Sequence, residues 1–555
     1  MSESAVFLGS PRFTDAGLAQ QARQDVGAAW RILLARGETE PLAGVEGEFA
    51  VGLHLAGGRV FLAVDRFAIR SLCYRQIGDK LHFAARANEL AALEPVAPVD
   101  PQAIFDYLYF HVIPSPRTIF QGVFRLPPGH CAQFTQGQLT ISCYWVPRFE
   151  EATRSDFGSL AAEFRDKLQA AVGAQLDGSK PACFLSGGTD SSTVAGMIGL
   201  AAGRAAATYS IGFDAEGYDE MAYARIAAQR FGTEHHEYYV TPEDVVRGIP
   251  TVAAHYDQPF GNSSAVPAYF CARFARDDGV TRLLAGDGGD ELFGGNTRYA
   301  KQRVFGWYQA VPRALKAVLE PALINPTAQS VALLRKAGSY IEQARVPMPD
   351  RLEMYNLLLR VGPERVLQPG FLAQVDRQGP SQHQRETWGA VEAEGALNRT
   401  LAFDWRYTLA EADLPKVCGT TQLAGVGVGF PFLDPGLLAF SMRLPAEYKL
   451  KGLKLRWFFK EALRGFLPEE IINKRKQGFG LPFGVWANRN SGLKGLAADA
   501  LHGIAARGIV RPEFAAELLK DLLPVHPGYY GEMVWILIML EHWLRAHAPA
   551  FQVRC

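Results

Sequence analysis

Residues 184–193 form the stretch Phe-Leu-Ser-Gly-Gly-Thr-Asp-Ser-Ser-Thr, which combines glycines, hydroxyl side chains and one carboxylate. Apolar Ala182 to Leu185 predict a buried strand, the next three residues a tight turn, and Ser191 to Leu200 a helix. Backbone N–H groups at such a turn converge with helix-start hydroxyls on one point and favour an anion. The carboxylate of Asp190 suits the Mg²⁺ that accompanies a nucleoside triphosphate. The pattern predicts a pyrophosphate-binding loop; a glycine-rich turn without a ligand is the simpler alternative.

Five further motifs follow this loop in order. They are Tyr209-Ser-Ile-Gly-Phe213, Tyr218-Asp-Glu220, Gly232-Thr-Glu-His-His-Glu237, Tyr256-Asp-Gln-Pro-Phe260 and Ala285-Gly-Asp-Gly-Gly-Asp-Glu-Leu-Phe-Gly-Gly295. The loop itself lacks the lysine of the P-loop and resembles the PP-loop of ATP pyrophosphatases, which attack the α-phosphate and release pyrophosphate. The order and spacing of all six motifs resemble the synthetase domain of the asparagine synthetase family (class B type).

The resemblance implies ATP and Mg²⁺ as cofactors and assigns residues to them. The implied nucleotide-binding positions are Leu185, Ser186, Gly187, Gly188, Asp190, Ser191, Ser192, Ile211, Ala285 and Gly286. The two carboxylates that match the family's Mg²⁺ ligands are Asp190 and Asp290. The aliphatic members of this set could equally belong to the core, and an aspartate in a glycine-rich turn often only forms an Asx turn.

Three further residues match catalytic positions of the family. Asp287 falls where the family carries Asp or Glu, close to the reacting α-phosphate and acyl group. Lys476, in the segment 474–482, matches a lysine that meets the adenylate, where a cation would stabilise developing negative charge. Arg456 matches a further cationic position that is often Lys. Basic clusters are usually solvated surfaces, so these roles depend on the resemblance.

The elements that must position these residues divide the chain in two. Residues 1–147 show short strand-like runs near Phe49, Val60, Leu72 and Leu81, separated by turn signals, and predict a β-rich domain. Residues 158–550 begin with alternating helix and strand patterns, which predict a parallel sheet flanked by helices, and continue into a mainly helical part. The expected fold class is therefore α/β. The resemblance further implies that the first part is a degenerate glutaminase-like domain of the N-terminal-nucleophile type and that the second is a PP-loop ATP pyrophosphatase domain.

Two departures from the family pattern affect the expected substrate. The family's glutaminase begins Met-Cys-Gly, whereas this sequence begins Met1-Ser2-Glu3 and its first cysteine is Cys73, so we expect a truncated domain without glutaminase activity. In the family stretch SLExRVPFLD, the Glu and Arg positions are here Gly427 and Gly429. Their loss predicts a roomier, less polar cleft that does not select free aspartate.

Bulk composition excludes several other classes of protein. Lys plus Arg and Asp plus Glu number 57 each, so there is no overall charge to attract nucleic acid or an anionic membrane. The seven cysteines include no CxxC pair, which favours reduced thiols in a cytoplasm. The first residues do not resemble a signal peptide, and the apolar run 533–540 is too short to span a bilayer. We therefore expect a cytoplasmic protein with no nucleic acid or membrane partner.

Together these features predict an ATP-dependent, AMP-forming carbon–nitrogen ligase. The favoured hypothesis is amide formation on a small-molecule or precursor-peptide substrate that carries its own amine, as in the related lasso-peptide cyclases (macrolactam formation) and β-lactam synthetases. One alternative is an amidotransferase that uses free ammonia or ammonia from a partner; another is a divergent asparagine synthetase. A catalytically inactive nucleotide- or peptide-binding scaffold is the alternative from a different class. A leader peptidase or an ammonia-supplying protein would be the corresponding partner.

Overall fold

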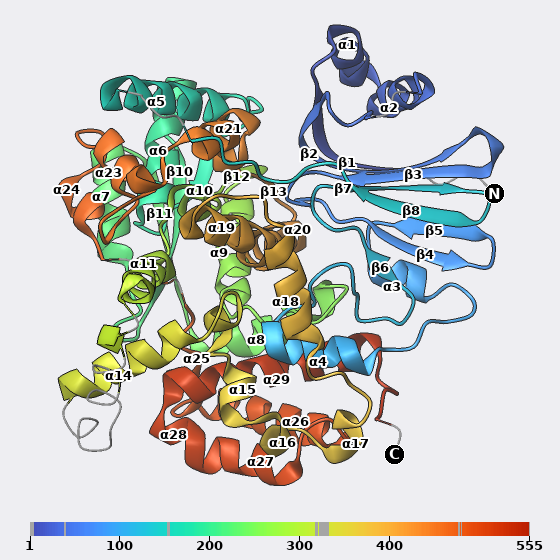
Figure 1. The fold of residues 1–555 in the computed structure, drawn as a ribbon, viewed down its shortest axis with the longest axis vertical. Coiled ribbons are helices and arrows are strands. Elements are labelled where there is room, and N and C mark those ends of the chain that lie inside the picture. Colours follow the sequence, from blue (N-terminus) through green and yellow to red (C-terminus); the bar gives the residue numbers. More distant parts are fainter. Residues whose placement is uncertain are drawn as a thin grey trace.

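A computed structural model describes residues 5–37, 40–151, 156–312, 314–316, 320, 332–475, 478 and 480–553 (Figure 1). A β-rich unit forms one side of the molecule, an α/β unit forms the other, and a group of C-terminal helices lies across the end of both (Figure 1). The mixed α/β class expected from the sequence is confirmed.

The N-terminal unit contains two antiparallel sheets. The larger has the order β1 (Val6–Phe13), β2 (Val45–Leu55), β3 (Arg59–Val64), β7 (His130–Thr135) and β8 (Gln138–Cys143). The smaller has the order β5 (Lys80–Ala84), β4 (Cys73–Ile77) and β6 (Phe124–Arg125). Helices α1 (Ala16–Gln24) and α2 (Val26–Ala35) pack on the larger sheet, with Trp30 buried against Phe13 and Phe49. The strand-like runs expected near Phe49, Val60, Leu72 and Leu81 correspond to β2, β3, β4 and β5.

The second unit is built on a five-stranded parallel sheet. Its order is β11 (Glu234–Val240), β10 (Ala207–Phe213), β9 (Ala182–Phe184), β12 (Arg282–Leu284) and β13 (Gly427–Gly429). From β9 the chain adds strands first on one side and later on the other, so the order reverses between β9 and β12. In open parallel sheets, ligands bind at such a reversal, outside the carboxyl ends of the strands. The loops that follow β9 and β12 are those with the candidate phosphate and metal residues.

Helices cover both faces of this sheet. They are α5 (Phe157–Gly173), α6 (Thr189–Ala202), α7 (Met221–Phe231), α8 (Pro242–His255), α9 (Ala265–Asp277) and α10 (Gly289–Phe293). Thr241 and Asp244 form a reciprocal capping box that starts α8. Gly203 and Gly232, both with positive φ, end α6 and α7. The helix expected over Ser191 to Leu200 is confirmed by α6.

The remaining elements are mostly helical. They are α3 (Ala87–Ala91), α4 (Pro101–Phe110), α11 (Thr297–Ala310), α14 (Ala332–Arg345), α15 (Leu357–Val361), α16 (Pro363–Val366), α17 (Pro369–Leu372), α18 (Gly379–Ala390), α19 (Ala396–Asp404), a π-helical segment (Trp405–Asp413), α20 (Leu414–Ala424), α21 (Pro435–Arg443), α22 (Ala446–Lys449), β14 (Leu450–Lys451), β15 (Lys454–Leu455), α23 (Trp457–Ala462), α24 (Glu469–Asn473), α25 (Phe483–Ala487), α26 (Ser491–Ala506), α27 (Pro512–Glu517), α28 (Leu523–Val525) and α29 (Pro527–His547).

Helix α29 is the centre of the C-terminal core. The apolar run Met533–Leu540 is fully buried within it. Helix α4 packs among these C-terminal helices (Figure 1), and the Tyr107 hydroxyl donates a 2.8 Å hydrogen bond to the Ile536 carbonyl. Across the part of the chain that the structure describes, no helix has the length and apolar character needed to cross a membrane.

Candidate active site

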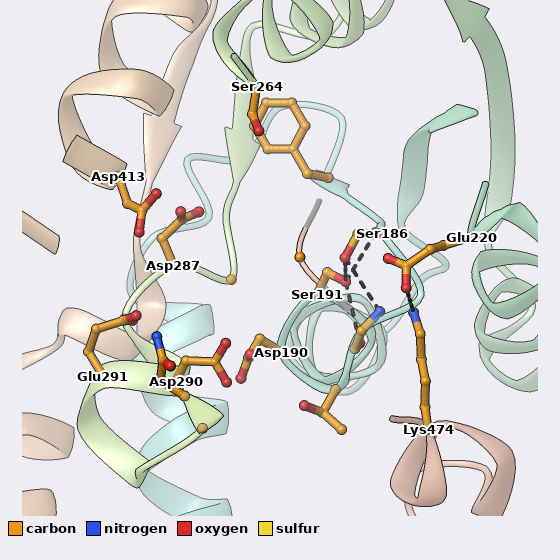
Figure 2. Close-up of a pocket in the computed structure, with 18 of the residues that line it drawn as sticks. Ser186, Asp190, Ser191, Glu220, Ser264, Asp287, Asp290, Glu291, Asp413 and Lys474 are labelled. Atoms are coloured by element: carbon orange, nitrogen blue, oxygen red, sulfur yellow. Dashed lines mark hydrogen bonds and ion pairs between the residues drawn. The ribbon is translucent and has the colours of Figure 1, made fainter. Parts of the chain in front are cut away.

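A cavity of about 1170 Å³ opens at the carboxyl ends of β9, β10 and β12. The loop after β9, the loop after β12, the π-helical segment, α20 and the segment 453–480 all contribute side chains to it. Figure 2 shows the start of α6 at its centre, with acidic side chains on one side and the Glu220–Lys474 pair on the other. The cavity therefore brings together motifs that lie up to about 290 residues apart in the sequence.

Local hydrogen bonds shape the predicted phosphate loop. The Ser191 hydroxyl accepts a 3.1 Å bond from the Ser186 N–H, and the two hydroxyls lie 3.1 Å apart (Figure 2). Gly187 has a φ of 70°, and a Cβ at this position would overlap Tyr223, so only glycine fits. The loop thereby turns its N–H groups and the first residues of α6 toward the cavity, as an anion site requires.

The two predicted metal ligands face each other across this loop. Asp190 begins α6 and Asp290 begins α10, and Figure 2 shows their carboxylates on neighbouring helix starts. Arg456 lies between them: its Nη1 is 2.7 Å from an oxygen of each carboxylate, and its Nη2 also pairs with Asp190. The structure therefore brings Asp190, Asp290 and Arg456, predicted from three separate motifs, into direct contact.

The residues around this pair fit a small oxygen-coordinated cation. Two carboxylates that reach the same nitrogen are close enough to share one ion, and Mg²⁺ prefers carboxylate and phosphate oxygens. A Cβ on Gly289 would overlap Asp190 Oδ1, and a Cβ on Gly295 would overlap Asp290 Oδ1. The two glycines thus form a space kept for the carboxylates. When bound, Mg²⁺ would neutralise phosphate charge there.

A second group of ligand-type side chains lies elsewhere. Glu234, His236 and Asp278 converge on the outer edge of the sheet. Lys180 Nζ already pairs with Glu234 at 3.1 Å and with Asp278 at 2.8 Å. Lys180 thus already offsets part of the negative charge of this cluster.

An acidic wall lines the cavity beside the metal ligands. Asp287, Glu291 and Asp413 gather there (Figure 2), and Lys416 lies 2.9 Å from Asp413 and 3.7 Å from Asp287. Burial raises the pKa of Asp287 and raises that of Glu291 to about 8. Burial is also the largest influence on Lys416 and acts to lower its pKa, but the charges of Asp413 and Asp287 outweigh it and raise the pKa above its usual value. This wall combines a protonatable carboxylate with a buried cation.

Sequence reasoning assigned Asp287 to the site but missed Glu291, Asp413 and Lys416. Glu291 directly follows Asp290 in a motif that was otherwise recognised. Asp413 and Lys416 are three residues apart, a spacing that brings side chains together on a helix, and this was the available signal.

Lys474 connects the segment after α24 to the phosphate loop. Its Nζ lies 2.7 Å from Glu220 at the start of α7 and 3.4 Å from the Gly187 carbonyl. Glu220 and Lys474 both lie in segments that the sequence singled out, but no role was predicted for either residue. Lys476, the predicted catalytic lysine, lies outside the described residues, although its neighbours Arg475 and Gly478 line the cavity.

The remaining nucleotide-binding positions divide between the cavity and the core. Ser186, Gly188, Ser191, Leu185, Ile211 and Gly286 line the cavity. Ala285 and Ser192 are buried, and neither is among the described residues that line it. Gly187 shapes the phosphate loop through its positive φ and its close approach to Tyr223.

Gly427 and Gly429, which stand where the family has Glu and Arg, are not among the described residues that line the cavity. Gly427 pairs with Arg282 at the amino end of β13, two residues before the strand's carboxyl end. A Cβ on Gly429 would meet Gln175, Arg282 and Leu284, so that space is already filled. The roomier cleft that does not select free aspartate stays a prediction, and the acidic wall gives the described lining its charge.

The N-terminal unit presents no activated thiol among its described residues. Burial raises the pKa of Cys73 and Cys131, and also that of Cys143, whose Sγ donates to the Trp145 carbonyl. A nucleophilic cysteine needs an accessible thiolate with a lowered pKa. None of these three side chains therefore has the properties of an activated nucleophile.

Comparisons with known proteins agree with this architecture. Residues 163–545 match the family described as asparagine synthase, and residues 13–145 match the glutamine amidotransferase domain. Asparagine synthetase [glutamine-hydrolyzing] 1 of Bacillus subtilis (strain 168) is 26% identical over 87% of this chain and 74% of its own length. Amidase chyE of Penicillium rubens is 25% identical over 80% of this chain and 70% of its own length.

Fold, cavity and relatives define the class as ATP-dependent amide-forming ligases or amidotransferases. The chain belongs to the asparagine synthase family, with a glutamine amidotransferase-like first domain.

Proposed function

We propose that this protein adenylates a carboxylate with Mg·ATP, releases pyrophosphate and transfers the acyl group to an amine. The observation that carries the proposal is the convergence in one cavity of three groups: the phosphate loop, the Asp190–Asp290 pair and the acidic wall with Lys416. An inactive scaffold would have no need to keep all three.

In the first half-reaction, a carboxylate oxygen of the substrate attacks the α-phosphorus, and pyrophosphate leaves from the opposite side. The N–H groups of the phosphate loop and the start of α6 are placed to hold the leaving pyrophosphate. Asp190 and Asp290 would hold Mg²⁺ against the phosphates. Bringing both reactants into one cavity lowers the entropic part of the barrier.

In the second half-reaction, an amine attacks the acyl carbon and AMP leaves. The attacking nitrogen must lose a proton, and Asp287 or Asp413 would accept it. Burial raises the pKa of Asp287, which makes it a stronger base than an exposed aspartate, while Lys416 favours its ionised form. We assign Lys476, by resemblance, to the negative charge that develops on the adenylate.

Two features support an amine that belongs to the substrate. The cavity of about 1170 Å³ exceeds the roughly 300–1000 Å³ that is typical of sites for one drug-sized ligand, so an acyl substrate can lie in it beside the nucleotide. Its acidic wall places three carboxylates around one lysine, which suits a cationic or amine group better than the second carboxylate of aspartate. A specialised acid or precursor peptide that closes its own amide ring, as in macrolactam cyclases and β-lactam synthetases, meets both conditions.

A second candidate is an amidotransferase that uses ammonia, free or supplied by a partner. The match of residues 13–145 to the glutamine amidotransferase domain and the names of the relatives favour it. The acidic wall would then hold ammonium, and only the acyl substrate would need the large cavity.

The test is pyrophosphate release from Mg·ATP by purified protein, offered free amino acids with ammonium, specialised acids and precursor peptides. We expect release with a specialised acid or peptide, with the amide product confirmed by mass spectrometry. Asp190→Asn and Asp290→Asn should abolish it, whereas Asp499→Asn, an exposed surface carboxylate, should not. Release with aspartate and ammonium to give asparagine would overturn the substrate proposal, and activity that survives both substitutions would overturn the metal assignment.

A further inference from the structure

Arg456 occupies the centre of the predicted metal site. Its Nη1 lies 2.7 Å from Asp190 Oδ2, 2.7 Å from Asp290 Oδ1 and 2.9 Å from the Thr189 hydroxyl, and its Nη2 pairs with Asp190 Oδ1. Its side chain is only 5% exposed. A single guanidinium therefore balances both carboxylates at the point on which they converge.

The local structure holds Arg456 in this position. The residue has a φ of 55°, a conformation that side chains with a Cβ rarely adopt, and it precedes α23 directly. Phe459, one turn into α23, lies under the guanidinium at 3.9 Å from its ring centre. Backbone and ring together aim the side chain into the space that Gly289 and Gly295 leave open.

One donor of this guanidinium is not used. Arg456 Nε is buried and has no hydrogen-bond partner among the described residues. A buried donor without an acceptor is unfavourable, and a phosphate oxygen in the adjoining loop would satisfy it. A bound phosphate would therefore be a second partner for the guanidinium of Arg456.

We propose that Arg456 is a resident counter-cation that replaces Mg²⁺ between the two carboxylates when no nucleotide is bound. The inference rests on the proposed function, because it takes Asp190 and Asp290 as the metal ligands. The arginine keeps the two carboxylates close together and prevents the free enzyme from binding metal alone. With Mg·ATP bound, the guanidinium would leave the two carboxylates and pair with the phosphates, and Asp190 and Asp290 would be left to hold the metal.

The proposal predicts that metal binds well only together with nucleotide. The test is Mn²⁺ binding measured by electron paramagnetic resonance, without nucleotide and with α,β-methylene ATP, which is not cleaved at the reacting bond. We expect Arg456→Gln to bind Mn²⁺ without nucleotide at least tenfold more tightly than the unmodified protein. Arg464→Gln is the matched control, because Arg464 lines the same cavity but pairs with Glu461 and Glu469. Its nucleotide-free affinity should not change.

The double variant Asp190→Asn with Arg456→Gln should lose the gained affinity, which would place the new Mn²⁺ site at the carboxylate pair. A folded Arg456→Gln protein with unchanged nucleotide-free affinity would overturn the proposal. If that variant does not fold, Arg456→Lys replaces it: a lysine keeps the charge but cannot bridge the same oxygens, so we expect intermediate affinity, and affinity equal to the unmodified protein would count against the proposal.

The proposed function would fail in a different arm of the experiment. In that case the unmodified protein would not bind Mn²⁺ with α,β-methylene ATP, or Asp190→Asn would bind it equally well. The two failures are therefore distinguishable.

Discussion

Several carboxylates lie close together in the cavity, and a neighbouring cation or protonation reduces the repulsion between them. Arg456 balances Asp190 and Asp290, while Lys416 balances Asp287 and Asp413. Glu291 has a pKa raised to about 8 by burial, which makes the protonated form dominant at neutral pH. Desolvated like charges are otherwise costly, so the cations determine which carboxylates are ionised and available as bases.

Removal of the Lys416 cation should therefore change the pH dependence of catalysis. In Lys416→Met, Asp287 and Asp413 would face each other without a cation, and the pKa of at least one would rise. We expect kcat at neutral pH to fall about a hundredfold, the range of a lost general base. The acidic limb of the kcat profile should move to higher pH, because the ionised base is lost sooner as the pH falls.

The measurement is kcat and KM of pyrophosphate release between pH 5.5 and 9. Lys416→Arg, which retains the charge, should restore the position of the acidic limb. Lys460→Met is the control, since Lys460 lines the same cavity from α23 without belonging to the acidic wall. An unchanged pH profile in Lys416→Met would show that this lysine has only a structural role.

At the scale of elements, the site is a consequence of strand order. Reversal between β9 and β12 separates the loops that follow them, and Asp190 and Asp290 come from the helices that begin there. Gly295 follows the C-cap of α10 and has no positive φ, so space alone requires glycine at this position. The position of the Asp190–Asp290 pair therefore depends on residues such as Gly295, which has no functional side chain.

Gly295→Ala should damage the site, although alanine is ordinarily tolerated. The added Cβ would overlap Asp290 Oδ1 and displace it, so we expect pyrophosphate release to fall at least about a hundredfold. Unfolding free energy should fall by about 1–3 kcal/mol. Gly306→Ala is the matched control: nothing lies near its Cβ in α11, and it should stabilise by about 0.5–1 kcal/mol. Thermal unfolding and pyrophosphate assays measure both, and an active Gly295→Ala would contradict the geometry.

The same elements show what the sequence could and could not predict. Strands β10 and β11 and helix α7 follow from local periodicity and glycine caps, and the phosphate loop follows from its composition. The segment Trp405–Asp413 is π-helical, so its wider turn places Thr408, Ala412 and Asp413 at the cavity in a register that a 3.6-residue period does not give. The position of Gly427 at the amino end of β13 likewise depends on tertiary pairing.

At the scale of the whole molecule, a buried ionic network joins the two units. Glu411, in the π-helical segment, accepts from the Ser115 hydroxyl at 2.7 Å and pairs with Arg125 and Arg406. Burial acts to raise the pKa of Glu411, but the two arginines and Ser115 outweigh it and lower the pKa to about 2. The segment that presents Asp413 to the cavity is therefore held by contacts with the N-terminal unit.

Glu411→Gln should destabilise the protein by about 3 kcal/mol at pH 7, because it leaves two arginines without their carboxylate. The folded-state pKa lies below the usual 4.5, so this stabilisation is present above pH 4.5 and is lost as the pH falls toward 2. The difference between the variant and the unmodified protein should shrink over that range. Urea unfolding at pH 7, 4 and 3 checks this. Glu163→Gln, at an exposed ion pair, should change stability by less than about 0.5 kcal/mol, and a similar result for Glu411→Gln would contradict the role of the network.

Because of helix α4, the N-terminal unit is part of the structure around the cavity, whether or not the unit catalyses a reaction of its own. It belongs to the C-terminal core and delivers Phe110, His111 and Val112 to the wall of the cavity. Natural selection that acts only on the ligase reaction would therefore still preserve this unit, since gene deletions that remove it would also open the substrate chamber. The scaffold of the first domain would then persist whether or not that domain has a reaction of its own.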